Sequence, residues 1–162
     1  MARAVPAGPV STPNGPKTMS LTFARIDLSQ VTYQVDLGSE LLDPVPVDEV
    51  QRVYRAYCAY KKFHSVMPMI PGRFLVPGTE VWGYRDNNQL VAWSMYRVWD
   101  PHSVVCDHHA WDYQNPQLQL GIRSFKNECA IYRDRGFKFM YFESVAPYMF
   151  DIEGFKVLES LE

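Results

Sequence analysis

Four consecutive residues, Cys106, Asp107, His108 and His109, form the densest group of titratable side chains in the chain. They lie in a run of β-branched and aromatic residues that predicts a strand beginning at Ser103. Because neighbouring strand residues point to opposite faces, we expect that His108 and His109 do not line one pocket. Asp107 and His109 then share a face, where the carboxylate orients an imidazole as a general base near neutral pH. The alternative is that these side chains are only packed or hydrogen-bonded on a face of the sheet and take no part in catalysis.

A glycine-bearing loop and a helix follow this strand. The helix has apolar residues at steps of three and four, at Ile122, Phe125, Cys129 and Tyr132. Ser124 is its candidate N-cap, although the first turn can also begin nearer Gly121, and Gly136 is the expected stop. The first N–H groups of such a helix have no intrahelical partner. The loop therefore either binds an anion such as a pyrophosphate, with Arg123 and Lys126 nearby, or is an ordinary connection.

The residues after this helix predict a strand at 137–142, a short helix opened by Ala146-Pro147 and a last strand at 155–157. A strand–helix–strand crossover of this length implies that its two strands pair in parallel. Upstream, we predict a strand at 21–26, a second strand or an irregular extension at 31–35, a helix at 48–63 and a hairpin of strands at 79–84 and 89–98. This order predicts an α+β fold with a mixed, mostly antiparallel sheet.

The glycine-bearing loop and the segment APYMFDIEGFKV at 146–157 resemble the GNAT acyltransferase superfamily over roughly residues 80–160. The resemblance implies a splayed central pair of parallel strands and flanking helices. It also implies that acyl-CoA, such as acetyl-CoA, is the cosubstrate. The residues that would bind its pyrophosphate are those of the loop and the first helical turn: Gln119, Leu120, Gly121, Ile122, Arg123 and Ser124. The Leu-Gly-Ile sequence is also similar to the aminoacyl-tRNA–protein transferases, which share this fold.

The resemblance also implies catalytic positions. In some members a base lies on the central strand about thirteen residues before the loop glycine, and this count reaches His108, with one residue of uncertainty in the register. The short helix in these enzymes carries a tyrosine that acts as general acid. Phe150 occupies that position here, so Tyr148 is the nearest hydroxyl. Asp112 and Glu143, near the strand ends, are second choices for catalysis.

Three functions follow from these residues. The first is transfer of an acyl group from a CoA thioester to the amine of a small molecule or peptide by direct attack. The second uses aminoacyl-tRNA as donor. The third is a catalytically inactive structural or interaction protein. It is favoured by Phe150, in place of the tyrosine, and by Arg123, because the family usually has glycine or alanine two residues after the loop glycine. A bulky Arg123 either narrows the phosphate site or contacts the phosphate itself. A homodimer is compatible with each of the three functions.

Composition limits the alternatives. A formal net charge of −2 argues against a general nucleic-acid binder, although Arg52, Arg55, Lys61 and Lys62 can form a local basic face. No apolar run has the length of a membrane span, and the first residues lack the apolar core of a signal peptide. Three widely spaced cysteines indicate reduced thiols in a cytoplasmic protein, without a metal site. Residues 1–19, with four prolines, predict a disordered arm before a single domain at 20–162.

Overall fold

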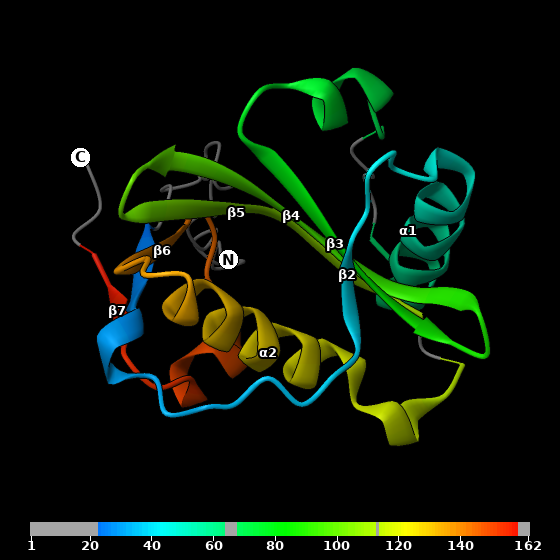
Figure 1. The fold of residues 1–162 in the computed structure, drawn as a ribbon. Coiled ribbons are helices and arrows are strands. Elements are labelled where there is room, and N and C mark those ends of the chain that lie inside the picture. The colour runs from blue at the N-terminus through cyan, green and yellow to red at the C-terminus, as the bar shows by residue number, and fades with distance from the viewer. Residues whose placement is uncertain (1–22, 64–67, 113, 159–162) are drawn as a thin grey trace, which may run out of the picture.

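The computed structural model describes residues 23–63, 68–112 and 114–158, so the predicted arm at 1–19 lies outside the described residues. Seven strands form one twisted sheet in the order β2-β3-β4-β5-β6-β1-β7 (Figure 1). The strands are β1 (Ala24–Asp27), β2 (Ser39–Leu41), β3 (Thr79–Asp86), β4 (Gln89–Asp100), β5 (Ser103–Trp111), β6 (Phe139–Phe142) and β7 (Phe155–Val157). The helices are α1 (Val47–Lys61) and α2 (Leu120–Asp134), and the short 3-10 turns are η1 (Leu28–Gln30), η2 (Pro71–Leu75), η3 (Pro116–Leu118) and η4 (Pro147–Asp151).

The predicted strand–helix–strand crossover is confirmed: β5, α2 and β6 follow one another, and β5 pairs with β6 in parallel. The other strand pairs within the described residues are antiparallel. The α+β class with a mixed, mostly antiparallel sheet is therefore confirmed. The N-terminal strand β1 lies between β6 and β7, so the two ends of the described chain meet in the sheet next to the crossover.

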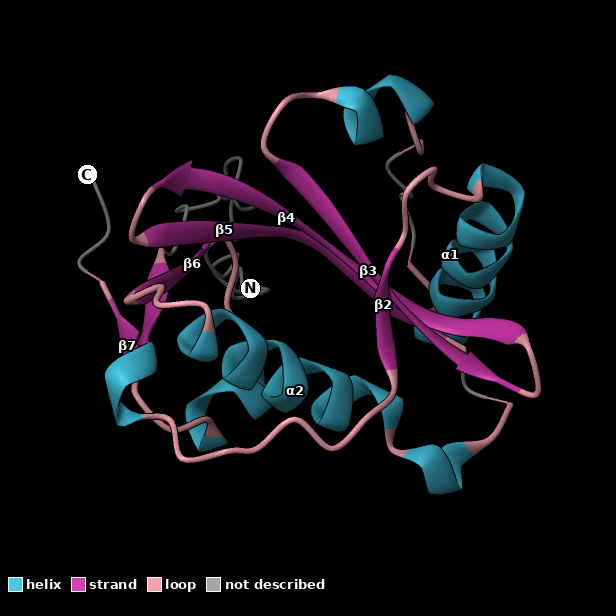
Figure 2. Cartoon of the chain, viewed as in Figure 1, coloured by secondary structure: helices cyan, strands magenta, loops and turns pink. Residues whose placement is uncertain are grey.

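The two long helices cover opposite faces of the sheet (Figure 2). Val50 and Val53 of α1 pack in one core with Trp93 and Met95 of β4. The alternate residue Tyr96 points to the other face, where Phe125, Cys129 and Tyr132 of α2 form a second core. The core beneath α1 includes no residue of β6, β1 or β7. The α1 face of those three strands is thus left without a helix packed on it among the described residues.

The structure decides two points for which the sequence left two alternatives open. Ser124 is not the N-cap: α2 begins at Leu120 after Gln119 (φ 49°), directly behind η3, and Ser124 is fully buried in the helix. The chain at 31–35 forms no strand. Arg133 of α2 instead donates to the carbonyl oxygens of Val31 and Tyr33 at 2.8 and 2.6 Å. A side chain thus satisfies backbone acceptors that a neighbouring strand would otherwise pair.

Candidate active site

The central strand β5 separates from β6 half-way along its length. Their parallel pairing runs from Ser103 opposite Phe139 to Cys106 opposite Phe142 and ends there, while β5 continues to Trp111. Beyond Cys106, the backbone groups of β5 that point toward β6 have no strand partner among the described residues. Unpaired backbone groups that are not covered by a strand are available to a ligand that lies along β5.

A β-bulge lies at the point of separation. Tyr96 of β4 is opposite Cys106 and Met95 is opposite His108, so Asp107 is an extra residue without a partner in the register. A bulge bends its strand and re-aims the side chains that follow. Asp107 and His108 therefore both contact residues on the α1 face, and His109 contacts α2. The prediction that Asp107 and His109 share a face is wrong, because strict alternation does not continue through a bulge.

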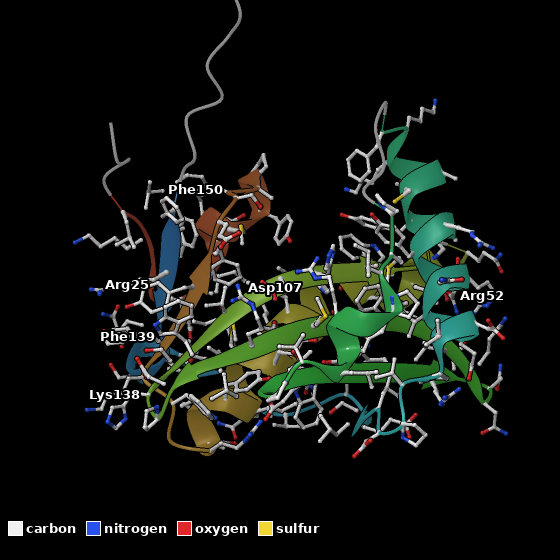
Figure 3. All side chains as sticks on the ribbon, turned by 90° about the horizontal axis from the view of Figure 1, so that it is seen from above. Arg25, Arg52, Asp107, Lys138, Phe139 and Phe150 are labelled. Atoms are coloured by element: carbon white, nitrogen blue, oxygen red, sulfur yellow. The ribbon has the colours of Figure 1, made fainter. Side chains whose placement is uncertain are left out.

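The gap between the strands holds a pocket of about 370 Å³, which we call the central pocket. Its walls are the second half of β5, Phe125 of α2, the segment that follows β6 and the end of α1. Asp107, His108 and His109 all line it. The expectation that the two histidines cannot line one pocket is therefore wrong, since a pocket between separated strands is open to side chains from both sheet faces. Figure 3 shows Asp107 near the middle of the molecule, between α1 and the β1–β6 side of the sheet.

Asp107 is held by two arginines. Its carboxylate accepts hydrogen bonds from Arg97 Nε at 2.6 Å and Arg97 Nη2 at 3.0 Å, and Arg73 Nη2 lies 3.7 Å away. The Asp107 side chain is only 6% exposed, and each of its two carboxylate oxygens lies near a guanidinium nitrogen. A bidentate arginine–carboxylate pair is strong and geometrically fixed. Asp107 therefore serves as a structural anion at the bulge rather than as a free base.

The His108 ring packs against the rings of Tyr54 and Trp93, at centroid distances of 6.1 and 6.0 Å. Arg73 Nη1 is 3.1 Å from its Nε2. A guanidinium can only donate, so Nε2 accepts this hydrogen bond and the ring proton is on Nδ1. Burial lowers the pKa of His108, and the charge of Arg73 lowers it further. The ring is thus kept in the form that can take up a proton once Arg73 releases Nε2.

His109 is the histidine on the α2 side. Its Nε2 is 2.7 Å from Ser124 Oγ, and its ring lies against Trp111 and Phe125 at 5.0 and 5.9 Å. Burial lowers the pKa of His109 to about 4, so the ring is neutral at pH 7. Its Nδ1 has no hydrogen-bond partner among the described residues. His109 is enclosed by aromatic rings, which favours a positioning role over proton transfer.

The turn η4 brings Tyr148 to the central pocket. The Tyr148 ring packs edge-on against Phe125 at 6.1 Å, and both residues line the pocket together with Glu143. Phe150 is 62% exposed, packs against Phe155 at 5.0 Å and does not line the pocket. Figure 3 shows Phe150 at the outer edge of the molecule. Tyr148 thus lines the central pocket, as do the hydroxyl-bearing residues Tyr57 and Ser144, and its role as general acid stays a prediction.

The start of α2 forms a second cavity of about 260 Å³, the loop pocket, between Asp112 and the first helical turn. Leu120, Gly121 and Ile122 line it, and their N–H groups have no acceptor among the described residues. Gln119 also lines this pocket. Unpaired N–H groups at a helix start carry the positive end of the helix dipole. Four of the six predicted cofactor-binding residues thus line one cavity, together with Asp112, whose carboxylate is paired with Arg52 at 3.4 Å.

Trp111 lines the loop pocket and packs against His109 and Tyr57, which line the central pocket. A Cβ atom at Gly121 would lie 2.7 Å from the Trp111 ring, so only glycine leaves room for this indole. The ring also contacts Tyr57 at 4.8 Å, and Lys61 Nζ lies 5.5 Å from its centroid. The absence of a side chain at Gly121 therefore serves the packing of Trp111.

The other two predicted cofactor residues lie away from the loop pocket. Arg123 bonds Leu118 O at 3.5 Å and Asp36 at 3.4 Å, and it lines neither pocket. Ser124 is buried against His109. Arg123 therefore neither narrows the cavity nor faces a phosphate within it.

Sequence reasoning did not identify Glu128, a fully buried carboxyl on α2. It accepts hydrogen bonds from the hydroxyls of Tyr84, at 3.0 Å, and of Tyr96. Burial raises the pKa of Glu128 to about 7. Its position in the helical pattern, three residues after Phe125 and one before Cys129, is the signal that places it on the buried face.

Comparison with solved structures identifies the architecture. An acetyltransferase described as a GNAT-family protein, from Novosphingobium aromaticivorans, aligns with a TM-score of 0.63 and 17% identity over 86% of this chain and 61% of that chain. This protein has the GNAT fold. The C-terminal domain of a protein described as a lysylphosphatidylglycerol synthetase, from Agrobacterium fabrum, aligns with a TM-score of 0.61 and 15% identity over 75% of this chain and 45% of that chain.

Saccharomyces cerevisiae N-myristoyltransferase, solved with myristoyl-CoA bound, also aligns, with a TM-score of 0.58 and 7% identity over 88% of this chain and 48% of that chain. The chain thus spans about half to three-fifths of the length of these three structures. At such identities the likeness shows the GNAT fold and not the substrate. No protein-family model matches the sequence, and no curated protein matches it.

The described residues contain no helix with the length and apolar character of a membrane span. They also contain no group of three or more histidine, cysteine or acidic side chains that could hold a metal ion.

Proposed function

We propose that this protein is an N-acyltransferase that moves an acyl group, such as acetyl, from a CoA thioester to an amine. The observation that carries the proposal is the end of β5–β6 pairing at Cys106, which leaves the central pocket open beside the unpaired second half of β5. GNAT-fold neighbours include an N-myristoyltransferase with bound myristoyl-CoA and aminoglycoside acetyltransferases, which supports acyl transfer as the class of reaction.

The residues present fit an acyl-CoA. The N–H groups of Leu120, Gly121 and Ile122 would hold the pyrophosphate in the loop pocket, and Lys61 adds a positive charge near Trp111. The unpaired backbone groups of β5 beyond Cys106 would hydrogen-bond the amide-bearing arm of the cosubstrate. When bound, the cosubstrate supplies the thioester carbonyl that the amine attacks.

The protein's own groups then position the amine and move its proton. In the transfer, the amine nitrogen forms a bond to the thioester carbon, the carbon–sulfur bond breaks, and the amine loses one proton while the thiolate gains one. His108 is the group that we assign to take the proton, because it is neutral and lines the central pocket. Tyr148, at the pocket wall, is placed to donate to the leaving thiolate. N–H groups of β5 next to the bulge would bind the carbonyl oxygen as negative charge develops.

Calorimetric titration with acetyl-CoA tests the proposal. Ile122→Pro deletes one N–H donor at a position in the first helical turn that tolerates proline, and Ile122→Ala is its matched control because it removes side-chain packing but keeps the donor. We expect saturable binding by the Ile122→Ala protein and binding weakened by roughly tenfold or more in Ile122→Pro, since a hydrogen bond to a charged group contributes about 1.5–3 kcal/mol. The proposal would be contradicted if acetyl-CoA produced no binding heat with the unmodified protein or either variant, or if Ile122→Ala and Ile122→Pro bound it with equal affinity.

A second candidate donor is aminoacyl-tRNA, which the similarity of Leu120-Gly121-Ile122 to the aminoacyl-tRNA–protein transferases suggests and for which Arg123, outside both pockets, leaves room. The predicted basic face has less unpaired positive charge than the sequence indicates, because Arg52 forms an ion pair with Asp112 at 3.4 Å and donates a hydrogen bond to Leu90 O. Retention of charged tRNA on a filter, with affinity that falls steeply with salt, would favour this donor over acyl-CoA.

A further inference from the structure

A third cavity, of about 290 Å³, lies on the sheet face opposite α2. Val105, Arg97 and Tyr141 alternate along their strands with Val104, Tyr96 and Met140, which belong to the core beneath α2. We call this cavity the far pocket. It is lined by Phe23, Arg97, Trp99, Asp100, Ser103, Val105, Tyr141, Phe142 and Glu143.

Aromatic rings form the apolar walls of the far pocket. Trp99 is 68% exposed, whereas Trp93 is fully buried and Trp111 is 9% exposed. A tryptophan side chain on a sheet normally buries most of its large apolar surface. Here Trp99 instead presents its ring beside a cavity that Tyr141 and Phe23 also line. An exposed ring at a cavity wall is available to a ligand, and the face of an indole attracts cations more strongly than other aromatic rings do.

Carboxylates supply the charge of the far pocket. Asp100 and Glu143 line it, and neither forms an ion pair within 4.0 Å of a described cationic group. The one arginine in the wall, Arg97, forms two hydrogen bonds with Asp107, and the charge of Glu143 adds to the effect of Asp107 in raising the pKa of Arg97. The pocket wall therefore combines aromatic faces with two carboxylates against one guanidinium, an excess of negative charge that is complementary to an organic cation.

The far pocket adjoins the central pocket. Phe142 and Glu143 line both cavities, at the position where β6 ends and β5 separates from it. A ligand in the far pocket thus reaches the edge of the central pocket from the opposite side of the sheet.

We propose that the far pocket binds an alkylammonium group, with Trp99 and Tyr141 around its carbon chain and Glu143 and Asp100 beside its charge. This proposal has two parts. The second part rests on the proposed function: the bound cation is one end of the acceptor amine, held next to the transfer site. The first part, the binding of the cation, does not require an acyl donor.

Direct binding without any acyl donor tests the pocket. The probes are 1-butylammonium and 1-butanol, which match in length and differ in charge. The full chain is titrated with each, and the indole N–H signal of Trp99 is followed by NMR, assigned by its loss in Trp99→Leu. We expect a saturable shift with butylammonium and an affinity for butanol that is lower by about tenfold, in line with a cation at an aromatic face that also carries carboxylates.

Three variants separate the contributions. Trp99→Leu keeps an apolar wall but removes the aromatic face, so butylammonium should bind several-fold more weakly while butanol changes little. Glu143→Gln should weaken butylammonium alone. Asp151→Asn, an exposed carboxylate outside the pocket, makes the same charge change and should have no effect.

Equal binding of the two probes, no saturable shift at Trp99, or the same result for Glu143→Gln and Asp151→Asn would overturn the proposal. These outcomes are independent of acetyl-CoA. Binding of butylammonium without binding of acetyl-CoA would support the cation site and contradict the proposed function. Binding of acetyl-CoA without binding of butylammonium would support the proposed function and contradict the cation site.

Discussion

The buried carboxyl of Glu128 makes the stability of the protein depend on pH in a way that one substitution isolates. Its pKa rises from 4.5 to about 7 in the folded state because of burial. A folded pKa above the unfolded one means that the folded state keeps a proton that the unfolded state has lost. The free energy of unfolding therefore falls as the pH rises from about 4.5 to about 7, and at 1.36 kcal/mol per unit the total from Glu128 is about 3 kcal/mol.

His109 contributes with the opposite sign over nearly the same interval. Burial lowers its pKa from 6.5 to about 4, so the unfolded state takes up a proton first as the pH falls. Its contribution is fully present above pH 6.5 and is lost as the pH falls toward 4. The two effects are of similar size, on the order of 3 kcal/mol each, and largely cancel in the unmodified protein. The pH profile of the unmodified protein alone therefore does not reveal either group.

Glu128→Gln removes one of the two effects. Relative to the unmodified protein, we expect the variant to gain about 3 kcal/mol in free energy of unfolding between pH 4.5 and 7.5. Urea unfolding at half-unit pH intervals measures this difference. Glu143→Gln, at an exposed carboxyl, is the control and should show no such trend. A Glu128→Gln difference that is the same at pH 5 and pH 8 would refute the reasoning, since it would mean that Glu128 titrates alike in both states.

Two further predictions concern the site. Gly121→Ala should destabilise the protein by about 1–2 kcal/mol, although alanine is the better helix former, because its Cβ would lie 2.7 Å from the Trp111 ring. In thermal or urea unfolding, adding Trp111→Leu should remove most of this loss of stability. A Gly121→Ala protein that is more stable than the unmodified one would contradict this. Arg73→Gln should raise the pKa of His108, because the charge of Arg73 adds to the effect of burial in lowering it. An NMR titration of the His108 ring protons measures the change, with Arg85→Gln, at a distant ion pair, as the control. An unchanged titration would show that Arg73 does not influence His108.

Most of the fold follows from local sequence patterns. The hairpin of β3 and β4, the crossover through α2 and the stop at Gly136 each have a nearby cause, in turn residues or helical spacing. The chain at 31–35 was harder to predict because its carbonyls are satisfied by Arg133, about one hundred residues away in sequence. Pairing of β1 between β6 and β7 likewise depends on long-range contacts that spacing along the chain does not encode.

The sequence indicated which segments line the central pocket and the loop pocket, but not how their side chains are arranged. Strict alternation places Asp107 with His109, but the bulge at Asp107 reverses that assignment, and a bulge has no sequence signal without a glycine at its position. The arginine partners of Asp107 come from β4 and η2, so the sequence alone shows a free carboxylate where the structure has a neutralised one. Whether the residues that line the central pocket bind a cosubstrate stays a prediction.

The most direct test of the central claim is amide chemical-shift mapping by NMR with acetyl-CoA. The separation of β5 from β6 and the unpaired N–H groups of α2 predict that the largest saturable shifts fall on residues 107–111 and 120–122. Absence of shifts at acetyl-CoA concentrations that saturate known transferases of this fold, or shifts confined to other parts of the chain, would contradict the assignment of these two pockets to an acyl donor.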